Sequence, residues 1–256
     1  MLQQFWIAYL TIARKEIRRF MRIWVQTIFP PVIMVALYFI IFGNLIGSRI
    51  GEMDGMTYID FIMPGLVMMS IITNSYANVV SSFYGAKYSR HIEEMQVAPV
   101  PDLVILSGFV TGGVARGMVV GIAVTLVSLL FTEFRIESPA IVVLVALLTS
   151  SLFAMAGMIN AIFANSFDDI SIVPTFVLTP LTYLGGIFYS ITLLPEFWQN
   201  ASLVNPILYM VNSFRYGFRG SSDIDLGTAL IVILAFNIVL FAVCLTLLKR
   251  GTGIRQ

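Results

Sequence analysis

The sequence predicts an all-α protein that crosses a membrane several times. Hydrophobic residues make up 58% of the 256 residues and charged residues only 11%, against roughly 25% charged in soluble domains. The apolar residues gather in six long runs, and Lys and Arg fall mostly on alternate gaps between them. Because a soluble fold of this length could not bury that much apolar area, we expect a single membrane domain over residues 1–256.

The N-terminal residues have the periodicity of an amphipathic helix. Over residues 2–22, apolar side chains recur on one face, and polar side chains that include Lys15, Arg18 and Arg22 fall on the opposite face. A helix with a basic polar face is typical of an element that lies along a membrane surface. We therefore expect residues 1–23 to form an interfacial helix on the cytoplasmic side. This helix either only anchors the chain or also contacts a cytoplasmic partner.

Each apolar run is long enough to cross a bilayer, because a hydrocarbon core of ~30 Å needs about 20 helical residues. The predicted spans are residues 24–47, 58–81, 104–131, 140–164, 171–189 and 227–248, so that spans one to five occupy residues 24–189. The intervening segment, residues 190–226, contains an apolar run that is too short to cross and is interrupted by Asn205-Pro206. We expect this segment to be re-entrant or interfacial on the outer side, where it must pack against protein.

The distribution of basic residues predicts the orientation. The residues on one side are Arg14, Lys15, Arg18, Arg19, Arg22, Lys87, Arg90, Lys249, Arg250 and Arg255, and those on the other are Arg49, Arg135, Arg215 and Arg219. Because cytoplasmic loops carry the excess of Lys and Arg, we expect both termini in the cytoplasm. The remaining basic residue, Arg116, lies within span three. It either has a functional role, or extends its side chain to the headgroups or forms an ion pair with a neighbouring span.

The loop between spans two and three is longer than a plain connection requires. Lys87, Arg90, Glu93 and Glu94 have helical spacing, with opposite charges three and four residues apart. Pro99 then ends the helix. This short charged helix is either a solvated connection or a docking element for a soluble partner.

Small and polar residues inside the spans indicate close packing and a conduit. Gly113, Gly117 and Gly121 are four residues apart, a spacing that lets helices approach closely within one subunit or between two copies. The spans contain almost no carboxylates, so a transported compound would be amphiphilic or held by apolar and hydroxyl contacts. The residues that could line its path, or alternatively serve in helix packing, are Asn74, Thr179, Thr182 and Tyr183.

Several classes of function lack their usual signatures. There is no Gly-x-x-x-x-Gly-Lys-Ser/Thr phosphate loop, so we expect no ATP binding by that route. Cys244 is the only cysteine and His91 the only histidine, and the net charge of +1 gives no indication of a nucleic-acid partner. A stand-alone ion-coupled carrier would normally place carboxylates in its spans, and a lipid-acting enzyme would need clustered polar groups. Both remain alternatives to an ATP-driven transporter subunit.

The distal third carries a string of residues that resembles a known family. It runs Pro180-Leu-Thr-Tyr-Leu-Gly-Gly-Ile-Phe-Tyr-Ser190, then Leu194-Pro195, Phe197-Trp198, Asn205-Pro206, Tyr209 and Arg215. This order of proline, small pair, Leu-Pro, Trp and Asn-Pro resembles the signature of ABC-2 type transporter permeases. The loop that ends Glu93-Glu94-Met-Gln-Val-Ala-Pro99 is also similar to that family's cytoplasmic loop. Here, however, Arg90-His91-Ile92-Glu93 stands where the family usually has Gly-Thr-Leu-Glu.

The resemblance implies a six-span exporter subunit of a bacterial inner membrane that forms half of a substrate conduit. Two copies would pair, and each would recruit a separate ATPase subunit that binds ATP and Mg, while this chain binds no cofactor and performs no hydrolysis. The ATPase would dock at Arg18, Lys87, Arg90, Glu93 and Glu94. The outer segment at residues 192–218 would cap the exit. Membrane lipid is the other expected partner, and the family's substrates range over lipids, polysaccharides, drugs and peptides.

Overall fold

A computed structural model describes residues 2–47, 52–53, 55–132 and 135–253, and the predicted outer and cytoplasmic cations Arg49 and Arg255 lie outside these residues. The elements are α1 (Leu2–Arg22), α2 (Trp24–Tyr38), its π-helical continuation η1 (Phe39–Ile46), β1 (Glu52–Met53), β2 (Met56–Thr57), α4 (Tyr58–Tyr88), α5 (His91–Val97), α6 (Asp102–Ser128), α7 (Pro139–Phe163), α8 (Asp169–Val173), η2 (Pro174–Leu178), α9 (Thr179–Tyr183), η3 (Ile191–Leu193), α10 (Glu196–Leu203), α11 (Pro206–Arg219) and α12 (Leu226–Arg250). The two short strands form an antiparallel pair.

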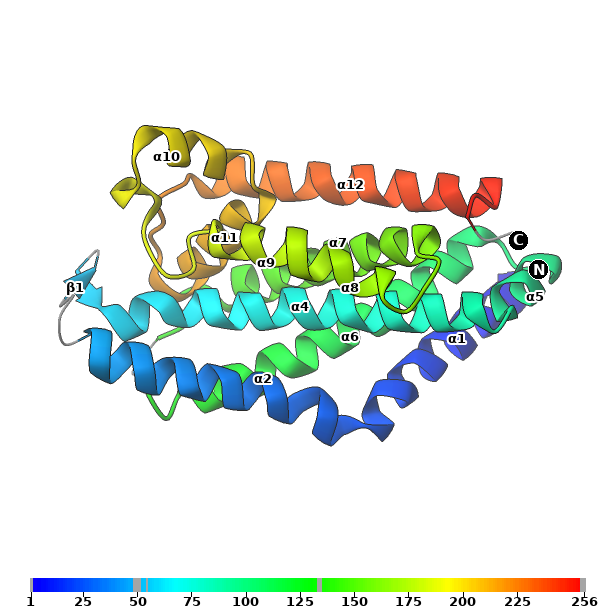
Figure 1. Ribbon diagram of the computed structural model, residues 1–256, viewed down its shortest axis with the longest axis horizontal. Helices are drawn as coiled ribbons and strands as arrows, with labels where there is room; N and C mark the ends of the chain where they lie inside the picture. The colour runs from blue at the N-terminus through cyan, green and yellow to red at the C-terminus, as the bar shows by residue number, and fades with distance from the viewer. Residues whose placement is uncertain (1, 48–51, 54, 133–134, 254–256) are drawn as a thin grey trace.

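The long helices form one elongated bundle (Figure 1). Within the described chain, five helices are long and apolar enough to cross a membrane: Trp24–Gly43, Tyr58–Tyr88, Asp102–Ser128, Pro139–Phe163 and Leu226–Arg250. Each coincides with one of the predicted spans, so the prediction of an all-α polytopic membrane protein is confirmed. α5 lies at one end of the bundle, together with the start of α1 and the end of α12, and we call this the α5 end (Figure 1). β1 lies at the opposite end, which we call the β1 end.

The span predicted at residues 171–189 is a shorter and irregular helical run. α8, η2 and α9 follow one another without a break, but together they cover only 15 residues. The run ends at Tyr183, six residues earlier than predicted, because the chain then turns at Gly185-Gly186, where Gly186 has a φ of +72°. The position of both chain ends at the α5 end requires an even number of passes. The count of six crossings stays a prediction, because this run is shorter than the about 20 residues of a full span.

The segment between α9 and α12 folds at the β1 end (Figure 1). α11 starts after Asn205, whose side-chain oxygen accepts a hydrogen bond from the N–H of Ile207 at 3.0 Å, and it ends at Gly220, where φ is +74°. Most of α11 is buried against α4, α7 and α12. The segment is therefore packed against protein, which is the condition for non-spanning backbone at membrane depth.

The N-terminal helix forms as predicted and also packs against the bundle. Ala13 and Phe20 are buried where α1 runs along α6, whereas Trp6 stays exposed. α1 ends at Arg22. The next residue, Ile23, has a non-helical backbone (φ −110°, ψ 37°), and α2 leaves in a different direction (Figure 1). An apolar stripe that partly faces protein and partly faces outward suits an interfacial helix.

α4 is the central helix of the bundle. It contacts α6, α7 and α11, and 78% of its membrane-spanning window is buried, against 17% for α2 and 11% for α12. The glycines of α6 make this possible, since a Cβ on Gly113 would lie 2.7 Å from Val79 and 2.8 Å from Ala154. The other predicted packing glycines face α4 in the same way, Gly117 against Ser75 and Gly121 against Ile71. The glycine stripe thus faces α4 within one subunit.

Replacing Gly113 with Val should destabilise the bundle by roughly 1–3 kcal/mol, because the added methyl groups cannot fit between α4 and α7. Gly85 is the matched control: it is also helical, but a Cβ there would meet nothing within 4 Å. We expect Gly85→Ala to leave stability unchanged or to raise it slightly. Reversible unfolding of the purified variants in mixed detergent measures both. Equal stability of Gly113→Val and the parent chain would contradict the packing described.

Candidate functional site

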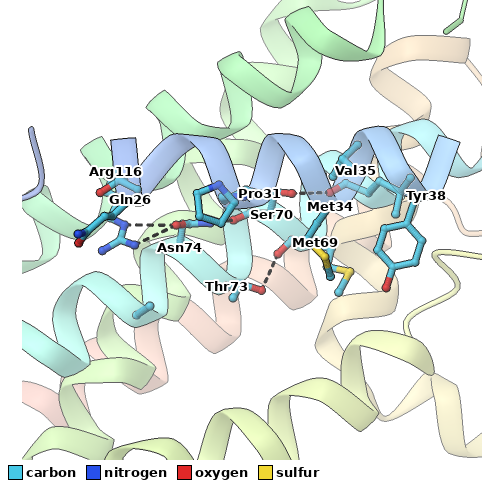
Figure 2. Close-up of a pocket in the computed structure, with 14 residues that line it drawn as sticks. Gln26, Pro31, Met34, Val35, Tyr38, Met69, Ser70, Thr73, Asn74 and Arg116 are labelled. Atoms are coloured by element: carbon cyan, nitrogen blue, oxygen red, sulfur yellow. Dashed lines mark hydrogen bonds between the residues drawn. The ribbon is translucent and has the colours of Figure 1, made fainter. Parts of the chain in front are cut away.

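A cavity of about 330 Å³ lies between α2 and α4 and reaches one residue of α6 (Figure 2). We call it the α2–α4 groove. Its walls are Gln26, Thr27, Pro30, Pro31, Met34, Val35 and Tyr38 from α2, Leu66, Met69, Ser70, Thr73, Asn74 and Ala77 from α4, and Arg116 from α6. Most of these side chains are apolar. Arg116, the one charged residue of this lining, lies at one end beside Gln26, and Tyr38 lies at the other (Figure 2).

Arg116 forms the charged end of the groove. Its Nε and Nη2 donate to the Oδ1 of Asn74 at 3.3 and 3.2 Å. The amide of Asn74 in turn donates to the carbonyl of Ser70 at 3.0 Å, which fixes its orientation. Arg116 is thus held by a neutral amide of the central helix. The partner on the neighbouring span is Asn74, which carries no charge, so this contact is not the expected ion pair.

A buried carboxylate lies where α1 meets α6. Glu16 has no exposed side-chain surface, and its oxygens are 3.5 Å from the Nζ of Lys15 and 3.5 Å from the Nε of Arg19. Arg19 also donates to the backbone oxygen and the Oδ1 of Asn78, at 2.7 and 2.9 Å. The absence of a side chain at Gly112 makes room for Glu16, because a Cβ there would overlap its side chain. Arg19 therefore joins α1 to α4 and balances the buried charge.

Sequence reasoning missed Glu16, although a signal was present. Its position, four residues after Ile12 and four before Phe20, places it in the buried stripe of α1 rather than on the basic face. An acid at such a position requires a cation from the same helix or from a neighbour. Arg19, three residues later, meets that requirement.

Lys87 does not have the exposed position predicted for an ATPase-docking residue. Its side chain is buried, and its Nζ donates to the carbonyl oxygens of Ile162 at 2.6 Å and Ala164 at 2.8 Å. These oxygens belong to the end of α7, whose last carbonyls have no partner within the helix. Lys87 therefore caps α7 and fastens it to α4, and an ATPase-docking role for this buried residue stays a prediction.

The turn that follows α7 is held by a second set of hydrogen bonds. The Ser166 hydroxyl donates to Asp169 at 2.7 Å, and the backbone N–H groups of Asn165 and Ser166 donate to the other carboxylate oxygen at 2.8 and 3.1 Å. These hydrogen bonds keep the pKa of Asp169 below its ordinary value. They fix the entry into α8 at the α5 end of the bundle.

The other predicted docking residues are accessible. Arg90 and Glu94 are exposed, Glu93 is half-buried, and Arg18 is exposed on α1. Beneath them, buried Ile92 holds α5 against the bundle. The Gln96 side chain also donates to the carbonyl of Leu248 in α12 at 3.2 Å. α5 is thus fastened on its inner side and presents charge on its outer side.

The predicted conduit residues do not gather in one place. Asn74 lines the α2–α4 groove, whereas Tyr183 lines a separate cavity of about 550 Å³ with Phe42, Phe188, Tyr189 and Trp198. Thr179 is exposed and donates to the carbonyl of Pro174 at 2.9 Å, and Thr182 is buried and donates to Leu178 at 2.6 Å. The residue that sequence reasoning missed is Tyr38, which borders both cavities.

Comparison with known proteins identifies the family. The model of the ABC-2 type transporter family matches residues 7–218. This chain belongs to the ABC-2 type transporter family. It is 59% identical over 256 residues to the inner membrane transport permease YadH of Escherichia coli K12, with all of both chains covered. It is 25% identical over 217 residues to nodulation protein J of Rhizobium meliloti, covering 84% of this chain and 82% of the relative.

Several residues of the distal string that carries the family resemblance pack together at the β1 end. The Asn205 amide donates to the carbonyl of Leu181 at 2.6 Å, in addition to its capping of α11. Buried Arg215 donates to the carbonyl of Gly186 at 2.8 Å and lies over the ring of Phe61, 4.0 Å from its centroid. These contacts connect the turn after α9 to α11 and α4, and Arg215 is buried among them.

Replacing Arg19 with Met should lower stability by about 3 kcal/mol, since Glu16 would stay buried with only the half-exposed Lys15 beside it. A second change, Glu16→Gln, should recover part of that loss. Arg18→Met is the matched control, because Arg18 is an exposed cation on the same helix and its loss should change stability by less than about 0.5 kcal/mol. Unfolding curves in mixed detergent give the comparison. Equal effects of the two arginine substitutions would contradict the buried-pair assignment.

Proposed function

We propose that this chain is the transmembrane subunit of an ATP-driven exporter in a bacterial inner membrane. Two copies pair to form the conduit, and each recruits a separately encoded ATPase subunit that binds ATP and Mg. Membership of the ABC-2 family and the name of the Escherichia coli relative support the permease role and the membrane. The lack of a phosphate loop in the sequence supports a separate source of ATP hydrolysis.

The observation that carries the proposal is the arrangement of the α5 end. α5 is a separate short helix with buried Ile92 on its inner side and exposed Glu94 and Arg90 on its outer side. Val97 and Tyr88 are 88% and 70% exposed on the same segment. Exposed apolar and aromatic side chains ringed by charges are typical of a protein–protein contact. The excess of Lys and Arg at this end favours a cytoplasmic position for it and for both termini.

The proposed mechanism follows from the short connection between α4 and α5. Only two residues, Ser89 and Arg90, separate the helices, and the Glu93 N–H donates back to the Arg90 carbonyl at 3.2 Å. Movement of a docked ATPase would press on α5 and tilt α4 against the glycine face of α6. Because Asn74 and Tyr38 border the α2–α4 groove, that tilt would change the shape of the groove. α10 and α11 at the β1 end would cap the exit.

The direct test is to tag this chain in its native host, purify it in mild detergent and identify what accompanies it. A soluble subunit with a phosphate loop, present in a one-to-one ratio, is the expected result. A homo-oligomer without such a subunit, reproduced after gentle cross-linking, would overturn the proposal and favour a stand-alone carrier.

The docking surface can be tested by reversing its charge. The double substitution Glu93→Lys and Glu94→Lys should reduce recovery of the ATPase at least tenfold, because two rim charges would then repel the groups they now attract. Glu196→Lys is the matched control, since Glu196 is an exposed acid at the β1 end. Quantitative mass spectrometry of the purified complexes measures the ratio, with membrane insertion checked by yield. Recovery of the ATPase at the parent level would contradict docking at α5.

A further inference from the structure

We propose that the α2–α4 groove binds a phosphate-bearing lipid-like amphiphile, with its phosphate on Arg116 and one acyl chain between α2 and α4. This inference names the class of compound that is transported. That the bound compound is then transported rests on the proposed function. The binding itself depends only on the groove. At about 330 Å³, the groove falls at the small end of the roughly 300–1,000 Å³ range of ligand sites, as expected for one chain and part of a headgroup.

At the charged end of the groove, the described residues give Arg116 no acidic partner. Arg116 donates to one neutral oxygen, that of Asn74. Among the described residues, the ion pairs both involve Glu16, whose carboxylate is fully buried between α1 and α6. None of the residues that line the groove is acidic. A bound phosphate would supply this guanidinium with an anionic partner through charge-assisted hydrogen bonds.

The shape and lining of the rest of the groove suit an acyl chain. Gln26 and Tyr38 mark the two ends of the groove (Figure 2). Both lie in α2, and a helix advances about 18 Å over that stretch at its rise of about 1.5 Å per residue. This length is similar to one leaflet, which is half of the ~30 Å hydrocarbon core. Pro30, Pro31 and Met34 form one wall and Leu66 and Met69 the other. Each wall contains one methionine, and methionine side chains adapt to ligands of different shape. The two walls therefore favour an apolar chain in general over one particular chain.

The geometry also accounts for the position of the charge. The guanidinium lies beside Gln26, at the end of α2 that joins α1. Under the predicted orientation this is the cytoplasmic side, so a phosphate would come from the inner leaflet while its chain points toward the β1 end. Arg is better suited than Lys to this role, because its planar guanidinium can keep the hydrogen bonds to Asn74 and still present an N–H to a phosphate oxygen.

Photolabelling of the full chain in phosphatidylcholine nanodiscs tests the proposal. The probe is phosphatidic acid with a photoreactive diazirine in one acyl chain, and the matched probe is the diacylglycerol with the same chains and no phosphate. We expect phosphatidic acid to label peptides of α2 and α4, and the substitution Arg116→Gln to reduce that labelling roughly tenfold. Arg116→Lys should retain part of it. Lys249→Gln, which removes an exposed cation at the end of α12, should have no effect.

The proposal is overturned if diacylglycerol labels the groove as strongly as phosphatidic acid, or if Arg116→Gln leaves the labelling unchanged. It is also overturned if the groove is covered by a second copy, which rapid disulfide formation between two copies of a Met34→Cys chain would reveal. Gel filtration of each variant keeps misfolded protein out of the comparison. Because the labelling needs no ATPase, its failure would leave the proposed function intact, and loss of the ATPase on purification would leave the labelling result intact.

Discussion

The arrangement of the bundle depends on the close approach of backbones to α4. A Cβ on Gly157 of α7 would lie 2.6 Å from the carbonyl oxygen of Tyr76, and a Cβ on Gly113 of α6 would lie 3.1 Å from that of Ser75. In lipid there is no hydrophobic force to bring helices together, so such contacts supply much of the packing energy. With α6 and α7 this close, α4 is buried over most of its length, and other elements must be placed around it.

Polar side chains of α4 connect this core to the functional parts. Asn74 holds Arg116 of α6 at the groove, Asn78 holds Arg19 of α1, and Lys87 caps α7. Each bond crosses from α4 to a different helix in a setting of low dielectric, where an unpaired partner would be costly. Under the proposed function, a displacement of α5 would therefore reach α1, α6 and α7 together through one helix. The groove is where that displacement would change the space available to a ligand.

The sequence predicted the long helices well, because length and apolar content suffice for them. It also predicted the Gly113 stripe, since four-residue spacing defines a helix face. It could not show which helix that stripe faces, nor that Lys87 is used inside the bundle, because the first depends on how α6 lies against α4 and the second on where α7 ends. The early end at Tyr183 depends on the turn at Gly186, and the pairing of Glu16 with Arg19 was overlooked although its spacing was readable.

The account's central claim is that α4 transmits motion of the ATPase from α5 to the groove. The most direct measurement is the distance between spin labels on Thr73→Cys of α4, which borders the groove, and Ile122→Cys of α6, two exposed positions away from the α5 surface, in the assembled complex. Cys244 is buried and can stay in place. The account predicts that trapping ATP shifts the distance distribution, and that Gly113→Ala, which crowds the α4–α6 contact, reduces the shift. An unchanged distribution in a complex that hydrolyses ATP would contradict it.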